Sequence, residues 1–394
     1  MTTPRFLQIH TLHHYSAALL NRDDAGLAKR LPMGDAIRTR ISSQCLKRHW
    51  RVADDAHSLV SLDIPMAVRS RGTLELIRDR IAAKGVSPEL AQCAAEALRT
   101  GGLLDAAGKD QKGEDALKTG QAVLLGKAEI DYLVERCTGL AFANPELKAL
   151  KAEVIQFLKN EKKNIEQLRY GSGLESALFG RMVTSDVLAS RDASIYVSHA
   201  FTVHEQQVEN DYFTVVDDLL REAGEQSSAG IFDTELASGL YYGYVVVDVP
   251  QLVANLEGLS IKECFLAASD KRALAGRVVN HLLHLIATVS PGAKRGSTAP
   301  FDYASFMLVE AGDWQPRSLA GAFHNALPTK TPQLRASAVG RLAEQIGQFD
   351  AAYGSTLARR FLALDAVEVA NAQRLPLKAL ADWTQEIVTT GKVA

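Results

Sequence analysis

The residues best suited to chemistry in this chain are the cations near its N-terminus. The first 51 residues contain nine lysines and arginines against three aspartates, a net charge of +6, whereas the whole chain of 394 residues carries −2. Cations grouped in this way neutralise the phosphates of a polyanion, although a basic surface can also be merely solvated. Because they are concentrated in so short a stretch, we favour a phosphate-binding site. They are Arg5, Arg22, Lys29, Arg30, Arg38, Arg40, Lys47, Arg48 and Arg51.

Residues 37–41 predict a strand that presents two of these cations. Apolar and basic residues alternate there, as in a strand with one buried face. Arg38 and Arg40 are therefore expected to project side by side from the face opposite the core. Residues 5–10 alternate in the same way and predict a half-buried first strand.

A basic helix is expected to follow residues 37–41. Ser42 or Ser43 is a suitable N-cap, and Leu46 and Trp50, four positions apart, would both face the core. The N–H groups and the positive dipole end of the first helical turn would point outward beside the two arginines and form a phosphate cradle. The helix itself would add the cations Lys47, Arg48 and Arg51.

The pattern along the rest of the chain indicates an α+β fold. Residues 73–170 are helical in character, whereas strand patterns occur at 194–203, 239–249 and 305–309, with an amphipathic helix at 274–289. Strands at both ends of the chain and a helical block between them predict one sheet-and-helix core that is interrupted by insertions.

The composition narrows the class of protein. With 47% hydrophobic and 23% charged residues, and no apolar run near the roughly 20 residues of a membrane span, a globular cytoplasmic protein is expected. The four cysteines are far apart, so neither a disulfide framework nor a zinc site is indicated. Phosphate-loop and nucleophile-elbow motifs are lacking, which weighs against nucleotide-driven and acyl-transfer enzymes. We expect no cofactor and no metal.

The histidines offer a weak alternative. His281 and His284 are three positions apart on the expected helix, a spacing that can place two imidazoles on one metal, but such pairs are far more often ordinary core or surface residues. A rival function remains a metal-dependent ribonuclease that uses His10, His13 or His199 with an aspartate.

Residues 199–240 form the most acidic part of the chain. Nine acids stand there against one arginine, a net charge of −8, and Tyr212 and Phe213 lie among them between strand patterns. An extended hairpin with this composition can present an aromatic wedge to stacked bases, or its aromatics can simply anchor it to its own core. We call residues 199–240 the arm. Because the arm is acidic and the N-terminal stretch is basic, copies of the chain are expected to associate head to tail in a helical array.

Five motifs occur in a characteristic order across about residues 5–325. They are Asn21-Arg-Asp-Asp, Arg40-Ile-Ser-Ser-Gln-x-Leu-Lys-Arg, Leu178-Phe-Gly-Arg-Met, Phe213-Thr-x-Val-Asp-Asp-Leu and Pro291-Gly-Ala-Lys. Together they resemble the motifs of the CasC family, the backbone subunits of type I-E CRISPR Cascade surveillance complexes.

This resemblance implies a hand-shaped α+β protein. A palm with a modified RNA-recognition-motif (ferredoxin-like) sheet would carry helical fingers and a β-hairpin thumb. The implied boundaries are 1–70, 171–200 and 239–394 for the palm and the C-terminal helical region, 71–170 for the fingers and 201–238 for the thumb.

The resemblance also implies roles for particular residues. Guide-RNA contacts would come from Arg22, Lys29, Arg38, Arg40, Ser42, Gln44, Lys47, Arg48, Arg51 and Lys294. Met182 would pack on a base, and Tyr212, Phe213 and Thr214 would act at the thumb, where one base is displaced from the stack. Target DNA would be held by Lys148, Lys151, Lys159, Lys162 and Lys163, although a solvated helix face is the alternative for these lysines.

The implied function is a non-catalytic one in antiviral defence. The protein would stack helically along the CRISPR RNA and order it for pairing with a target DNA strand. Its partners would be that RNA, the target DNA, further copies of itself and the other Cascade subunits, without a membrane. Besides the ribonuclease, a subunit that touches only protein remains a rival.

Overall fold

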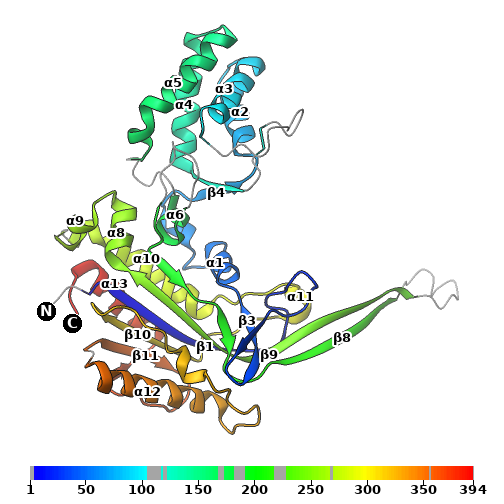
Figure 1. Ribbon diagram of the computed structural model, residues 1–394, viewed down its shortest axis with the longest axis vertical. Coiled ribbons are helices and arrows are strands. Elements are labelled where there is room, and N and C mark those ends of the chain that lie inside the picture. Colours follow the sequence, from blue (N-terminus) through cyan, green and yellow to red (C-terminus); the bar gives the residue numbers. More distant parts are fainter. Residues whose placement is uncertain are drawn as a thin grey trace. The chain divides into compact units, whose positions relative to one another are not determined.

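The computed structural model describes residues 4–103, 117–118, 122–166, 173–181, 191–216, 228–266, 269–354 and 356–393. The chain forms two compact units, whose elements are labelled in Figure 1. The first unit contains Met1–Leu59, Tyr196–Val247 and Gly276–Ala394, and the second contains Val60–Ile195 and Asp248–Ala275. Three distant segments therefore build the first unit, which confirms the prediction of a core interrupted by insertions.

The first unit is organised around a large, mostly antiparallel sheet. Its strand order in the described residues is β12-β11-β10-β1-β9-β7-β3-β2, and β6 and β8 pair with β9. The sheet and its helices confirm the α+β class. The strands are β1 (Phe6–Ala18), β2 (Arg30–Met33), β3 (Ala36–Ile41), β6 (Ile195–Val197), β7 (Ala200–Thr202), β8 (Gln207–Val216), β9 (Ser228–Asp248), β10 (Phe306–Gly312), β11 (Ala358–Ala363) and β12 (Ala372–Arg374).

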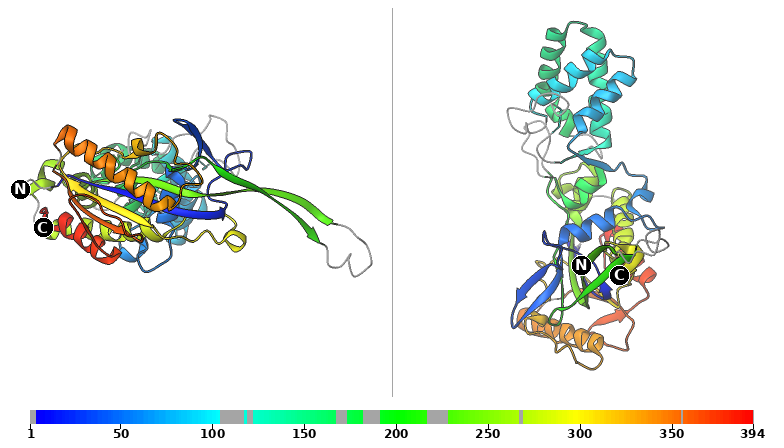
Figure 2. Two further views of the ribbon diagram at one scale, coloured as in Figure 1. Left: turned by 90° about the horizontal axis from the view of Figure 1, so that it is seen from below. Right: turned by 90° about the vertical axis from the view of Figure 1, so that its right-hand side faces the viewer.

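Helices cover both faces of this sheet (Figure 2). On one face, Leu342 of α12 packs in a cluster with Leu12 of β1 and Phe306 of β10. Toward the other face, His13 and Tyr15 of β1 line one cavity together with Ile286 of α10. The helices of this unit are α1 (Ser43–Arg51), α10 (Ser269–Thr288), the short α11 (Arg295–Thr298), α12 (Leu334–Tyr353) and α13 (Leu377–Thr390), of which α10 begins in the second unit.

The expectation of a half-buried first strand is therefore wrong. Residues Phe6–Leu12 of β1 are all buried, including Gln8 and His10, and the strand continues to Ala18. The reason is the two helical layers, which leave no solvent-facing side in the middle of the sheet. Polar residues on β1 must then find partners inside the protein.

One such set of partners is a buried ionic network beneath α12. Glu310 of β10 accepts hydrogen bonds from Arg359 and Arg317 and lies 3.2 Å from the ring of His10. Arg359 also bridges to Asp350 of α12, at 2.6 and 2.7 Å. These hydrogen bonds and cations hold the pKa of the Glu310 carboxyl far below its usual range, although burial alone would raise it.

A long hairpin extends from the sheet and is clear in Figures 1 and 2. Its strands, β8 and β9, pair antiparallel from Gln207 and Ser238 at the base to Val216 and Ser228. This is the acidic arm expected at residues 199–240.

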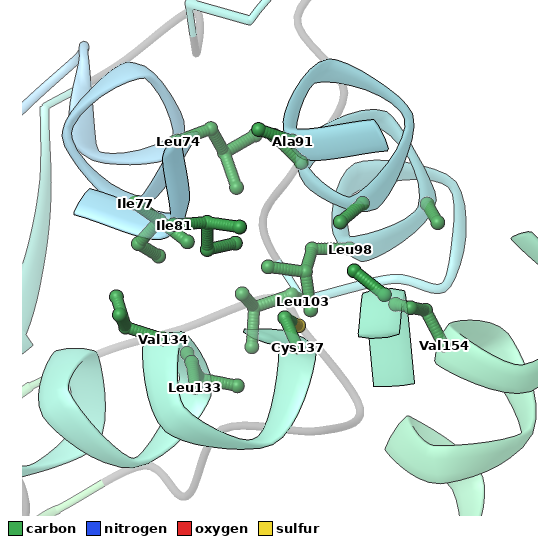
Figure 3. Packing of buried hydrophobic residues seen from close by; sticks show 14 of the residues in the cluster. Leu74, Ile77, Ile81, Ala91, Leu98, Leu103, Leu133, Val134, Cys137 and Val154 are labelled. Atoms are coloured by element: carbon green, nitrogen blue, oxygen red, sulfur yellow. The ribbon is translucent and has the colours of Figure 1, made fainter. Parts of the chain in front are cut away.

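The second unit contains the helical block that the sequence indicates. Figure 3 shows the core that its helices share, in which Leu74, Ile81, Leu98, Leu133 and Val154 are fully buried. A short sheet is an addition to the expected helices. The elements are β4 (Ala67–Ser70), α2 (Thr73–Ala83), α3 (Pro88–Thr100), β5 (Val123–Gly126), α4 (Lys127–Ala143), α5 (Leu147–Glu166), α6 (Gly173–Phe179), α8 (Val249–Glu257) and α9 (Ile261–Leu266).

The boundaries given for palm, fingers and thumb stay a prediction. The second unit is larger than the helical block, since it also takes in residues 60–70, 171–195 and 248–275. Among the described residues, no helix combines the length and the apolar character that a membrane crossing requires.

The buried His10 and the half-buried His13 should make the stability of the first unit depend on pH. Burial lowers the pKa of His13 from 6.5 to about 4, and that of His10 is also lowered, chiefly by burial. Both groups take up protons more readily in the unfolded chain. Their contribution is therefore complete above pH 6.5 and is lost as the pH falls toward 4.

We expect the free energy of unfolding to fall by roughly 3 kcal/mol for His13 alone across this window. Urea denaturation followed by tryptophan fluorescence measures it, because Trp50, Trp314 and Trp383 all lie in the first unit. His13→Phe should flatten the pH dependence. An unchanged pH dependence in this variant would contradict the role given to His13.

Candidate nucleic-acid interface

Helix α1 begins where the sequence predicts. Ser42 is its N-cap, and its hydroxyl accepts a hydrogen bond from the backbone N–H of Cys45 at 3.3 Å. Trp50 is buried and Leu46 packs against a neighbouring cluster that includes Ile41 and Tyr241. The apolar side of the helix therefore faces the sheet, as expected from its spacing.

The opposite side of α1 carries its polar and basic residues. Gln44 and Arg48 are exposed, and Lys47 and Arg51 are half-buried. These positions are three or four residues apart, so they lie along one face of the helix. Burial lowers the pKa of Lys47.

Three further cations come from the chain segments beside α1. The backbone N–H of Arg40 donates to the carbonyl of Lys29 at 2.8 Å, which places these two residues next to each other across adjacent strands. Arg22 is exposed, and its backbone forms an isolated antiparallel β-bridge with that of Ala28. Asp23 closes this turn by accepting hydrogen bonds from two backbone N–H groups. We call Arg22, Lys29, Arg40, Gln44, Lys47, Arg48 and Arg51 the basic face.

Arg38 does not belong to the basic face, contrary to the prediction. It is 0% exposed, whereas its apolar neighbour Ile37 is 44% exposed. The Arg38 guanidinium donates to the backbone carbonyls of Thr202 and Phe323, at 3.3 and 3.0 Å. The expected pattern is thus reversed only at Ile37 and Arg38, since Thr39 and Ile41 are buried and Arg40 is half-buried. A loop from the C-terminal part of the chain covers the face on which Arg38 lies and supplies acceptors for it.

The phosphate cradle at the start of α1 is also not as predicted. The N–H of Ser42 donates to Asn21 Oδ1 at 2.9 Å, and the N–H of Ser43 donates to His199 Nδ1 at 3.1 Å. Cys45 N–H is bonded to the Ser42 hydroxyl. Since these three donors already have partners within the protein, they are not available to an anion.

Lys294 is brought to the same region by a clamped loop. His49 of α1 donates from Nδ1 to the carbonyl of Cys45 at 2.8 Å, so its Nε2 accepts the N–H of Gly292 at 3.3 Å. Ala293 N–H also donates to the carbonyl of Leu19. Lys294, in the left-handed conformation, then reaches Thr234 of the arm with its ammonium at 3.2 Å. No pattern in the sequence around His49 indicates this role.

The described part of the arm presents Tyr212 to solvent. This side chain is 64% exposed, so the alternative that it anchors the hairpin to its own core is wrong for Tyr212. The side chains of Phe213 and Thr214 lie outside the described part of the structure. The exposed acids of the arm are Glu205, Glu209, Asp211 and Asp233.

Among the acids of the arm that the structure describes, Glu235 is the buried exception. It is only 7% exposed, and its carboxylate accepts hydrogen bonds from the backbone of Ala28 and from the guanidinium of Arg30, both at 2.7 Å. It fixes the base of the arm to the segment that carries Lys29. In the sequence, Glu235 is only one of the nine negative charges of residues 199–240. No neighbouring residue indicates which way its side chain points.

The other predicted site residues lie in the second unit or outside the description. Lys148, Lys151 and Lys159 are exposed on α5. The side chains of Lys162 and Lys163 and the whole of Met182 fall outside the described residues.

Two of the histidines named for metal or catalytic roles already have hydrogen-bond partners within the protein. His10 is fully buried and bonded to Tyr242 and Glu310. His281 points its Nδ1 at the backbone carbonyls of His57 and Ser58. Within the described part of the chain, no group of three or more His, Cys, Asp or Glu side chains is arranged to hold a metal ion.

Comparison with known proteins places this architecture in a family. The chain matches the profile of the CT1975-like protein family over residues 7–387, nearly its full length. The protein therefore belongs to the CT1975-like family. No curated protein sequence matches it significantly.

Two solved structures share its fold. One is a chain described as "CRISPR RNA-guided surveillance complex, pre-nicking", with a TM-score of 0.76, 24% identity, and 97% of this chain and 100% of that chain covered. The other, described as "CRISPR RNA-guided surveillance complex", has a TM-score of 0.64, 21% identity, and 95% and 99% covered. Family and fold together confirm the resemblance to CasC-like subunits that the motifs indicate.

The different positions of Arg38 and Arg40 lead to opposite expectations for their removal. Arg38→Met should lower the free energy of unfolding by about 2–4 kcal/mol, because two buried carbonyls lose their donor. Arg40→Met should change it by less than about 1 kcal/mol, since Arg40 is half-exposed. Urea denaturation followed by tryptophan fluorescence compares the two variants. Equal losses would show that Arg38 is not a buried structural residue.

Proposed function

We propose that this protein is a non-catalytic RNA-binding backbone subunit of a CRISPR Cascade surveillance complex. The observation that carries the proposal is the basic face, which gathers six cations from three chain segments around α1. The proteins that share its fold are described as parts of CRISPR RNA-guided surveillance complexes. The assignment to type I-E rests on the sequence motifs.

In this proposal the protein binds the guide RNA through its backbone. Arginine and lysine side chains on α1 and β3 neutralise phosphates, an interaction that is independent of base identity. The base edges stay available for pairing with a target DNA strand, so that sequence recognition belongs to base pairing. The exposed lysines Lys148, Lys151 and Lys159 would hold that DNA by charge.

Successive copies would stack head to tail along the RNA. The arm presents exposed acids and the exposed Tyr212, and the basic face presents cations, so the two surfaces of one copy are complementary in charge. Because they are different surfaces, such a contact generates an open helical array. The arm of one copy would then close over the guide held by the next and displace a base.

The ribonuclease alternative is less well supported. His10 is enclosed in the buried network, and His13 is held neutral by burial, so neither is available as a surface acid or base. A subunit that contacts only protein is also disfavoured, because such a role does not need the basic face. Co-purification of RNA, seen as high absorbance at 260 nm, would exclude it.

The double variant Lys47→Ala/Arg51→Ala should weaken binding of single-stranded RNA by about tenfold, equally for different sequences. The slope of log K against log salt should become smaller by about 1.4, since two phosphate contacts are lost. Filter binding across a salt series measures both. The matched control is Lys262→Ala/Lys271→Ala, which removes two exposed lysines of the second unit.

An unchanged affinity and an unchanged salt slope in the Lys47→Ala/Arg51→Ala variant would show that these two side chains of the basic face do not bind RNA. The RNA recovered from the same assay should be intact with and without EDTA. Metal-dependent cleavage that a His199→Ala change abolishes would instead establish the ribonuclease.

Tyr212→Ala should reduce the fluorescence increase of 2-aminopurine bases placed along a bound RNA, because fewer bases are unstacked when the aromatic ring is absent. Tyr353→Ala is a matched control, since Tyr353 is also 64% exposed but lies on α12. An equal signal from wild type and Tyr212→Ala would contradict a wedge role for Tyr212.

A further inference from the structure

One exposed histidine lies beside the basic face and is not among the residues proposed above to bind RNA. His199 is exposed and immediately precedes β7. In the antiparallel pairing of β3 with β7, Arg40 is opposite Phe201 and Ile41 is opposite Ala200, so the next position places His199 opposite Ser42. Its ring therefore lies at the junction of β3 and α1.

The hydrogen bond to Ser43 fixes the chemical state of this ring. A backbone N–H can only donate, so Nδ1 of His199, at 3.1 Å from Ser43 N, is an unprotonated acceptor. The proton of the neutral imidazole is then on Nε2. Within the described part of the chain, no hydrogen-bond acceptor for this Nε2–H is found. A protonated ring would place two donors against each other at Nδ1 and is disfavoured.

The surroundings also keep the ring neutral. Partial burial, and then the positive charges of Arg40 and Lys29, lower the pKa of His199. The same two cations attract phosphate to the place where Nε2–H is available. An uncharged N–H donor near two cations is well suited to a phosphate oxygen, because it adds a directional hydrogen bond without further repulsion.

From this arrangement we infer that His199 is an RNA-binding residue, whose neutral Nε2–H donates to a phosphate oxygen of the guide backbone held by Arg40 and Lys29. The inference rests on the proposed RNA-binding function. His199 would have two roles, since its Nδ1 holds the first turn of α1 and its Nε2 binds the ligand. The position of the ligand would thereby be tied to the helix that carries Lys47 and Arg51.

Two substitutions separate these roles. In His199→Asn the amide oxygen replaces Nδ1 and can still accept from Ser43 N–H, but no atom reaches the position of Nε2. In His199→Gln the amide nitrogen reaches the Nε2 position, whereas the acceptor for Ser43 is lost. His14→Asn is the matched control, an exposed histidine outside the basic face.

We expect His199→Asn to weaken binding of a fluorescein-labelled, mixed-sequence single-stranded RNA by about tenfold, with urea stability unchanged. The salt slope should stay as in wild type, because a neutral donor releases no counterion, whereas Arg40→Gln should make it smaller. His199→Gln should bind RNA more tightly than His199→Asn and unfold at lower urea. Single-stranded DNA should show the same loss as RNA with His199→Asn.

Several results would overturn this inference. Wild-type affinity in His199→Asn would mean that His199 only caps α1, and a smaller salt slope would mean that it acts as a cation. A loss confined to RNA would assign the contact to a ribose hydroxyl instead of a phosphate. If the wild-type protein binds neither RNA nor DNA, the proposed function itself is wrong. If the wild-type protein binds RNA and His199→Asn binds it equally well, only the inference about His199 is wrong.

Discussion

The basic face depends on how the first turn of α1 is held. Asn21 and His199 each accept one backbone N–H at the start of the helix, and Ser42 accepts a third. These acceptors come from the turn after β1 and from the segment before β7, so the helix is fixed to two parts of the sheet. Unpaired N–H groups at a helix start are costly when water is excluded, which gives this arrangement its stability. The directions of all the cations on α1 follow from it.

The sheet behind α1 has a different source of rigidity. Because helices cover both of its faces, the strands bury polar groups that the sequence places on an apparently exposed side. The network of His10, Glu310, Arg317, Arg359 and Asp350 is the result, and every carboxylate in it is met by a cation. Removing one member would leave an uncompensated buried charge, so the network specifies how β1, β10, β11 and α12 pack.

The arm is joined to this body through polar contacts at its base. Glu235 holds Ala28 and Arg30, and Thr234 is reached by Lys294. Both contacts connect the arm to segments that carry cations of the candidate interface. A displacement of the arm would therefore change the positions of cations in the candidate interface, and a displacement of those segments would move the arm.

The sequence alone determined the elements whose signals are local. Ser42 as an N-cap, the apolar spacing of Leu46 and Trp50, the helical block from residue 73 and the acidic hairpin are each specified by residues within a few positions of one another, so pattern and propensity suffice. The grouping of cations and the family motifs are likewise properties of the chain itself. The α+β class followed from the order of these elements.

Only the tertiary structure decided which side chains lie on the candidate interface. Arg38 is buried because the carbonyls of Thr202 and Phe323, from distant segments, meet it there, and no pattern within β3 encodes that loop. His199 and His49 gained roles for the same reason: each finds its partner more than 150 residues away, at Ser43 and Gly292. Long-range hydrogen bonds of this kind depend on the packing of layers, whereas local sequence fixes only the elements that are packed.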